Sequence, residues 1–206
     1  MRIGLFGGSF NPMHAGHLLV MAETLRRLRL DALWVLMTPG NPLKDNAGLP
    51  DLAARVWAAR DVIGDPRIRV TGFEAEKGFT YTWQTIDFLV RSLPGRRFVW
   101  IMGADSLADF HRWERWQDIA AKVPMAVYVR PGAGRRALAS RAAATLDHAQ
   151  LDEKKAPILA TRRAPAWVYL QGRQSGLSST AIRAEKSSPR PDLAKIPPNA
   201  HIPSQA

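Results

Sequence analysis

The sequence contains no cysteine at all. A chain without thiols has no disulfide, no thiolate nucleophile and no iron–sulfur or thiolate–zinc site. Long apolar runs are also missing, because the longest one spans only residues 32–37, whereas a membrane-spanning helix needs roughly 20 apolar residues. The first eight residues offer one basic residue and few apolar ones, which is too little for a secretory signal. We therefore expect a protein of the cytoplasm that does not engage a membrane.

Acidic residues are scarce relative to basic ones. The 206 residues include 29 Lys and Arg against 18 Asp and Glu, which gives a formal net charge of +11. Residues 130–190 hold twelve of the basic residues and only four acidic ones. Such a field suits nucleic acid, a membrane surface or a polyphosphate substrate, and a solvated basic face without function is about as common. Charge alone leaves these alternatives open.

Strand and helix patterns alternate along the chain. Residues 2–6 are typical of a short buried strand, and apolar steps of four, three and three predict a helix from near residue 14 to near residue 30. The run 32–37 is typical of a strand buried on both faces of a parallel sheet. Further helices are expected over 51–63 and 82–92, an aromatic-rich helix after 103, and further strands over 68–70, 97–102, 125–129 and 166–170. This order predicts one α/β domain built on a doubly wound parallel sheet with right-handed crossovers.

Two segments show no clear pattern. Residues 130–163 include an alanine-rich stretch dotted with arginines, and we expect a helical surface excursion there. After residue 187 the composition shifts to Ser, Pro and Lys, which is typical of chain without packed structure. The predicted organisation is therefore one domain over residues 1–186 and a flexible tail over 187–206.

The strongest local signal is the segment 7–17, Gly-Gly-Ser-Phe-Asn-Pro-Met-His-Ala-Gly-His, between the first strand and its helix. Glycines there let the backbone approach a phosphate closely, and a helix N-terminus offers unpaired N–H groups and a partial positive charge. His14 and His17 lie three residues apart, so their side chains should share one face of the first turn. Capping, packing or metal ligation are the plainer roles for such a pair, and the glycine loop favours phosphate binding.

Other chemistries fail when their motifs are sought in the sequence. The chain has no Gly-x-x-x-x-Gly-Lys-Ser/Thr, no Gly-x-Gly-x-x-Gly after the first strand, and no second glycine for a hydrolase nucleophile at Ser9. The remaining histidines fall in unrelated segments, and no His-Glu-x-x-His pattern occurs. We expect no metal site formed by the protein itself.

A second signal is the segment 176–183, Gly-Leu-Ser-Ser-Thr-Ala-Ile-Arg. Hydroxyl side chains at a helix start cap it, and together with backbone N–H groups they can also hold phosphate oxygens. Arg183 would add a charged fork one turn later. A plain N-cap is the commoner role of such a segment, so its functional weight comes from its occurrence with the first motif.

The two motifs together resemble the nucleotidylyltransferase superfamily with its His-x-Gly-His motif and its Ser/Thr-rich motif ending in Ile-Arg. Three intermediate segments are similar to those of the bacterial nicotinate mononucleotide adenylyltransferases: residues 38–44, 81–85 and 101–107, the last running on to Trp113 and Trp116. The resemblance spans roughly residues 1–185 and implies a Rossmann-like nucleotidylyltransferase fold. It implies transfer of the adenylyl group of ATP to nicotinate mononucleotide, in NAD biosynthesis.

The resemblance also implies roles for individual residues. ATP would be bound by the glycine loop, by the ribose-binding Asp105 and by the Ser/Thr turn; these residues are Gly7, Gly8, Ser9, Phe10, His14, His17, Gly103, Asp105, Ser179, Thr180 and Arg183. The catalytic group would be His14, His17, Lys44 and Arg183, which hold the triphosphate. Thr82 and Trp113 would bind the pyridine nucleotide, with the indole stacked on its ring. Plainer roles stay open here: core packing for Trp113, a solvated charge for Lys44 and a helix cap for Asp105.

The acceptor's phosphate is already anionic, so no general base is needed, and a magnesium ion would be carried by the substrate phosphates. Two alternatives remain: an adenylyltransferase for another acceptor, such as nicotinamide mononucleotide or phosphopantetheine, or a basic nucleic-acid-binding module. We expect ATP and nicotinate mononucleotide as partners and no nucleic acid. A homo-oligomer, and the order of the tail, are left open.

Overall fold

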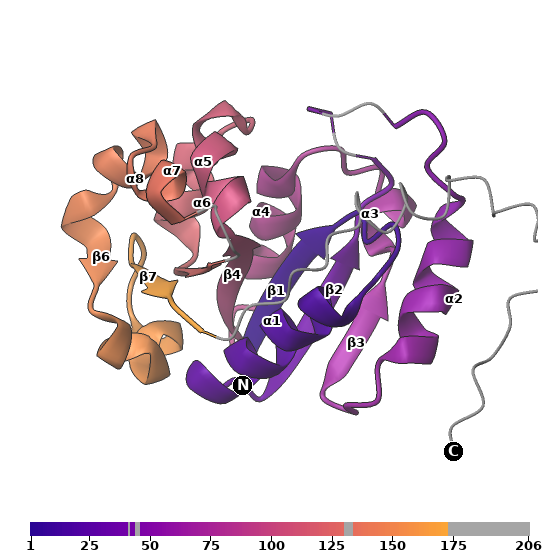
Figure 1. The fold of residues 1–206 in the computed structure, drawn as a ribbon, viewed down its shortest axis with the longest axis horizontal. Coiled ribbons are helices and arrows are strands. Elements are labelled where there is room, and N and C mark those ends of the chain that lie inside the picture. Colours follow the sequence, from indigo (N-terminus) through magenta and orange to yellow (C-terminus); the bar gives the residue numbers. More distant parts are fainter. Residues whose placement is uncertain (41, 44–45, 130–133, 173–206) are drawn as a thin grey trace, which may run out of the picture.

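A seven-stranded parallel sheet forms the centre of the molecule (Figure 1). The structure is a computed structural model, and it describes residues 1–40, 42–43, 46–129 and 134–172. The strand order is β3-β2-β1-β4-β5-β7-β6, and every neighbouring pair is parallel. The strands are β1 (Arg2–Gly8), β2 (Ala32–Met37), β3 (Ile68–Thr71), β4 (Arg97–Gly103), β5 (Met125–Tyr128), β6 (Gln150–Leu151) and β7 (Trp167–Leu170).

Helices connect the strands and cover both faces of the sheet. The α-helices are α1 (Ala15–Arg27), α2 (Leu52–Val62), α3 (Phe73–Glu76), α4 (Thr82–Ser92), α5 (Ala104–Asp109), α6 (Trp116–Lys122), α7 (Gly134–Leu138) and α8 (Arg141–Thr145). The 3-10 helices are η1 (Phe110–Arg112), η2 (Asp147–Ala149) and η3 (Glu153–Thr161). Among the described residues, no helix combines the length and the apolar character that crossing a bilayer would require.

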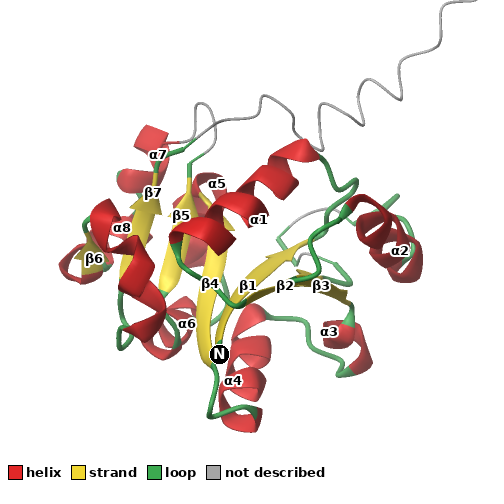
Figure 2. Ribbon diagram, turned by 90° about the horizontal axis from the view of Figure 1, so that it is seen from below, coloured by secondary structure: helices red, strands yellow, loops and turns green. Residues whose placement is uncertain are grey.

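Each face of the sheet carries its own hydrophobic core, because side chains alternate along the strands. In β4, Phe98, Trp100 and Met102 point into the core beneath α4, α5 and α6. Val99 and Ile101 point into the opposite core beneath α1, α2 and η3. Figure 2 shows α1 and α4 on opposite sides of the sheet. The two-sided burial explains why the central strands lack the polar alternation of a half-exposed strand.

The strand order reverses direction between β1 and β4. From β1 the chain first builds outward through β2 to β3, and it then crosses to β4 and continues outward on the other side. The last paired residues of the two strands are Phe6 and Ile101, so the segments that follow leave the sheet side by side. Such a reversal is where open α/β sheets bind ligands, at the carboxyl ends of the strands. The doubly wound parallel sheet predicted from the sequence is confirmed.

Some predicted boundaries shift. The helix α1 ends at Arg27, three residues before the predicted end, because Arg29 adopts a left-handed φ of 51°. The Leu30 N–H then donates to the Leu25 carbonyl at 3.0 Å, which closes the helix in a Schellman-type turn. The aromatic-rich helix expected after residue 103 is divided into α5, η1 and α6. Arg115, with a φ of 51°, interrupts the helical backbone before α6.

The surface excursion predicted for residues 130–163 is wrong over its described part. The residues 134–161 form α7, α8, η2, η3 and the edge strand β6, which extends the sheet beside β7. Ala137, Ala142 and Leu159 are at most 1% exposed. Small alanine side chains let these short helices pack closely against α5 and β7, so the segment closes one end of both cores.

Candidate functional site

The glycine loop leaves the sheet at the carboxyl end of β1. Gly8 ends the strand, and six residues separate it from Ala15, where the helix α1 begins. Phe10 has a φ of 44°, a left-handed backbone angle that costs a residue with a side chain roughly 1–3 kcal/mol. Its ring is 5% exposed and lies 5.2 Å from the ring of Phe6 and 5.0 Å from that of His17. Burial of the ring therefore holds the loop in its strained shape.

The two histidines of the loop cap the helix together. His14 is the N-cap of α1, and its Nδ1 accepts the Gly16 N–H at 3.1 Å. The Nδ1 of His17 accepts the His14 N–H at 3.3 Å. Because both Nδ1 atoms accept, each neutral ring carries its proton on Nε2, which makes Nε2 a donor for an anion. The ring centroids are 3.8 Å apart, so the structure brings the predicted pair together.

The junction of β4 with α5 provides the second predicted group. Gly103 is the N-cap residue, buried, and Asp105 is the exposed second residue of α5. Capping was the plainer role considered for Asp105, and the N-cap position itself is occupied by Gly103, two residues earlier. An acidic side chain in the first turn is favoured by the helix dipole. Asp105 thus lies two residues after the end of β4, the strand that pairs with β1 where the strand order reverses.

Thr82 is the first residue of α4, which follows the carboxyl end of β3. The Gln84 side chain accepts the N–H groups of Thr80 and Tyr81, both at 2.9 Å, and so caps this helix start. Behind it, the buried Glu74 accepts the hydroxyl of Thr85 at 2.6 Å. Burial raises the pKa of Glu74 above its usual value, and the Thr85 hydrogen bond opposes that rise. The turn that carries Thr82 is therefore fixed from both sides.

Trp113 follows η1 and is half-buried. Its ring meets Trp100 edge to face at 6.2 Å and Phe110 at 5.3 Å. Trp116 also packs against the same core. Core packing, the plainer role considered for these tryptophans, is thus real, and the half-exposed Trp113 still has surface left for a ligand.

Four predicted site residues lie outside the described residues: Lys44, Ser179, Thr180 and Arg183. Within the described part of the chain, no three His, Asp or Glu side chains gather closely enough to hold a metal ion. The sequence interpretation missed one residue that contacts the glycine loop, Arg55 of α2, which is 5% exposed. An arginine in a helix usually faces solvent, so the sequence offered no signal for its burial.

The described geometry is that of a nucleotide-binding α/β protein, with a histidine-capped glycine loop at the reversal of a parallel sheet. A family model described as cytidylyltransferase-like matches residues 5–185. The chain belongs to this family.

Curated relatives narrow the comparison. The chain is 56% identical over 183 residues to a "probable nicotinate-nucleotide adenylyltransferase" of Methylorubrum extorquens, with 89% of this chain and 99% of the relative covered. A protein of the same name from Brucella suis is 50% identical, with 89% of this chain and 94% of that protein covered. The predicted resemblance to nicotinate mononucleotide adenylyltransferases is confirmed.

Solved structures share the fold. A Plasmodium falciparum nicotinic acid mononucleotide adenylyltransferase complexed with NaAD superposes with a TM-score of 0.66 at 16% identity, covering 89% of this chain and 82% of that one. The same enzyme complexed with APC gives a TM-score of 0.65. At this identity the match concerns the fold alone, and it agrees with the Rossmann-like architecture predicted from the sequence.

Proposed function

We propose that this chain transfers the adenylyl group of ATP to nicotinate mononucleotide, giving nicotinate adenine dinucleotide and pyrophosphate in NAD biosynthesis. One observation carries the proposal above the others. The paired histidines and the glycine loop lie at the reversal of the sheet, in a chain 56% identical over 183 residues to a relative named for this reaction.

The reaction makes modest chemical demands on the protein. A phosphate oxygen of the acceptor attacks the α-phosphorus of ATP, a new P–O bond forms, and the bond to the pyrophosphate oxygen breaks. Because the nucleophile is already an anion, the protein has to align two charged substrates and stabilise the charge that spreads onto pyrophosphate. Donors held in place before the substrates arrive suit this task best.

The described residues would divide this work among the glycine loop after β1, the junction of β4 with α5, and a third region that carries Thr82 and Trp113. His14, His17 and the glycine loop would bind the triphosphate, with Nε2–H groups and the N–H groups at the start of α1 as donors. Gly103 and Asp105 would position the adenosine, with the carboxylate accepting from ribose hydroxyls. Thr82 and Trp113 would receive the pyridine nucleotide.

Lys44, Ser179, Thr180 and Arg183 complete the proposal as further ligands of the triphosphate, carried over from the family resemblance. Mg²⁺ would enter with ATP, because it prefers phosphate oxygens and water as ligands and would neutralise part of the triphosphate charge. His14, His17 and the glycine loop would bind the phosphate oxygens directly and would not bind the metal ion.

A direct assay tests the proposal. The purified chain is given ATP and MgCl₂ with nicotinate mononucleotide, nicotinamide mononucleotide or phosphopantetheine, and pyrophosphate release and the dinucleotide product are followed. We expect the highest kcat/KM with nicotinate mononucleotide. Absence of pyrophosphate with every acceptor, together with steeply salt-dependent RNA binding, would instead support the nucleic-acid-binding alternative.

A further inference from the structure

Arg55 lies in the first turns of α2 and is 5% exposed. Toward the described residues its guanidinium donates three hydrogen bonds, and each of these acceptors is a backbone carbonyl. Nε donates to Pro50 at 2.9 Å, and Nη1 donates to both Ser9 and Thr38 at 3.0 Å. One buried side chain thus joins the start of its own helix to two segments that lie 46 and 17 residues away in the sequence.

Two of these segments are the loops at the carboxyl ends of central strands. Ser9 directly follows β1 and belongs to the glycine loop, and Thr38 directly follows β2. The Thr38 N–H also donates to the Gly8 carbonyl at 3.1 Å. Arg55 therefore ties together the two backbone segments that leave the sheet on the α2 side of the proposed triphosphate site.

Burial is unusual for a guanidinium. Burial lowers the pKa of Arg55 below its usual value, and the nearby charge of Asp51 only partly opposes that effect. No carboxylate forms an ion pair with Arg55 among the residues that the structure describes. Burying an unpaired cation is costly, and the planar guanidinium of arginine can donate to several carbonyls at once.

The contact with Ser9 determines how the next peptide is oriented. The Ser9–Phe10 bond is trans, so the Ser9 carbonyl and the Phe10 N–H point in opposite directions. Arg55 holds the carbonyl and thereby directs the Phe10 N–H away from α2. Phe10 is the residue with the left-handed φ of 44°, and its ring contacts His17 at 5.0 Å.

We propose that Arg55 is a positioning residue for adenylyl transfer: it holds the loops after β1 and β2 so that His17 and the glycine loop meet the triphosphate in reactive geometry. This inference rests on the proposed function, because it concerns the same triphosphate site. Arg55 acts through backbone carbonyls and needs no contact with the substrate. Small displacements of aligned groups can cost about a hundredfold in rate, so a brace of this kind has a measurable effect.

The test compares Arg55→Met, which removes charge and fork, with Arg55→Lys, which keeps the charge and loses the fork. We expect kcat/KM for ATP to fall roughly tenfold to a hundredfold in Arg55→Met and by less in Arg55→Lys. Affinity measured by calorimetry should weaken for ATP and stay unchanged for adenosine, since adenosine is assigned to the β4 side. A merely structural role would not produce this dependence on phosphates.

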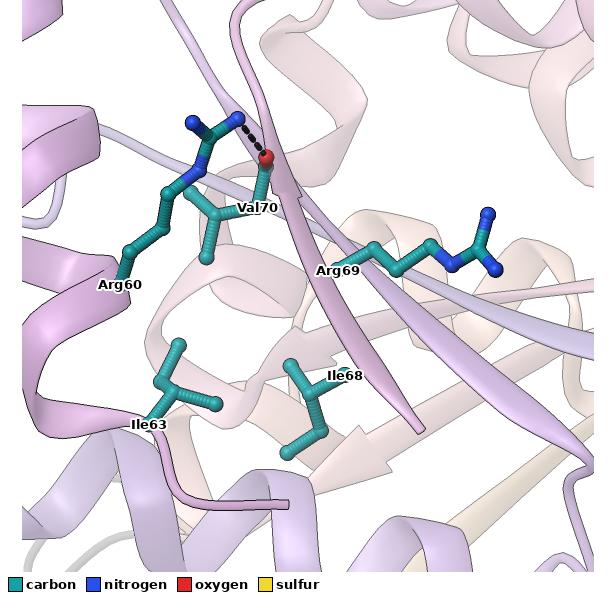
Figure 3. A pocket seen from close by; sticks show the side chains of 5 residues that line it. All are labelled: Arg60, Ile63, Ile68, Arg69 and Val70. Carbon is teal, nitrogen blue, oxygen red and sulfur yellow. Dashed lines mark hydrogen bonds between the residues drawn. The ribbon is translucent and has the colours of Figure 1, made fainter. Parts of the chain in front are cut away.

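Arg60 offers a matched control on the same helix. Its Nη2 donates to the Val70 carbonyl at 3.0 Å, at the edge of the sheet (Figure 3). It lines a pocket of about 310 Å³ with Ile63, Ile68, Arg69 and Val70, none of which is assigned to the proposed site. Arg60→Met also removes one arginine–carbonyl contact, and we expect it to keep wild-type kcat and KM.

Hydrogen–deuterium exchange separates failure of this inference from failure of the proposed function. In Arg55→Met the peptides covering residues 6–14 and 36–40 should exchange at least several-fold faster, while those of β4 and α5 stay protected. A wild-type chain without pyrophosphate release refutes the function and leaves this readout valid. Folded Arg55→Met or Arg55→Lys with wild-type kinetics and protection, or equal weakening of ATP and adenosine, overturns the role of Arg55.

Discussion

The two central strands, β1 and β4, are connected to the helices that follow them in different ways. After β1, six residues intervene before α1, and they include the strained Phe10 and the histidine cap. After β4, the helix α5 begins at the next residue. The long loop can hold several donors around a polyphosphate, but its shape depends on Phe10 and on contacts from α2. The direct junction holds one carboxylate, whose position follows from the strand itself.

The largest effect is expected on the loop side of this comparison. In His17→Ala, turnover should fall roughly a hundredfold to a thousandfold, because one fixed donor to the developing charge is lost. Unfolding is not expected, and circular dichroism and thermal melting check this. His148→Ala is the matched control, since His148 is exposed on η2. This helix precedes β6 and so lies toward the amino ends of the strands, whereas the proposed site lies at their carboxyl ends. Wild-type turnover in folded His17→Ala would remove the histidine pair from the site.

The junction side is tested with Asp105→Ala. Loss of a charged acceptor for ribose hydroxyls should weaken ATP binding by about 2 kcal/mol, roughly thirtyfold in KM, with a smaller change in kcat. Asp109→Ala, at the other end of α5, serves as the control and should keep the wild-type KM. An unchanged KM for ATP in Asp105→Ala would show that the β4 junction does not bind adenosine.

Gly7→Ala tests how closely the two strands must pack. A Cβ at Gly7 would lie 2.6 Å from the indole ring of Trp100 in β4, and Trp100 is 2% exposed, so it has little room to move. We expect a loss of about 1–2 kcal/mol in the free energy of unfolding, measured by denaturant titration. Wild-type stability would mean that the indole shifts freely and that β1 and β4 are less tightly matched than the structure indicates.

The smallest effect is expected at the far end of β1, away from both junctions. Hydrogen bonds from Arg2 hold the pKa of Asp31 at about 2 instead of 3.8. A lowered folded-state pKa stabilises the protein above the ordinary aspartate pKa, and this contribution is lost as the pH falls from about 4 to about 2. In Asp31→Asn this part of the pH dependence should disappear, by under about 1 kcal/mol because both side chains are over a third exposed. Unchanged acid titration of stability would contradict the pairing.

The sequence predicted best where one physical signal was strong. The apolar run of β2 and the pattern of α4 gave both elements their observed bounds, and β1 and α2 were placed within two residues. Helices of five residues, such as α7 and α8, give no apolar periodicity because they span barely more than one turn. Their burial depends on what packs around them, so the same segment was wrongly taken for a surface excursion.

The residues of the candidate site likewise include some that the sequence predicted and some that it did not. The histidine pair was predictable because its two members are three residues apart and a helix start brings them together. Arg55 was not, because its role arises from carbonyls that lie 46 and 17 residues away in sequence. Contacts to backbone leave no side-chain pattern in a single sequence. Trp113 was assigned to the pyridine ring by resemblance, and its core contacts became visible only in the structure.

The two edge strands, β3 and β6, each have a feature that hinders addition of a further strand to the sheet. An open strand edge can pair with a second chain and seed aggregates. At β3 the Arg60 side chain donates to the Val70 carbonyl, and Arg69 adds a further charge (Figure 3). At the opposite border, β6 is only two residues long. Two arginines lie at the β3 edge, and the β6 edge strand is very short. Neither edge is therefore suited to pairing with a strand of another copy of this chain.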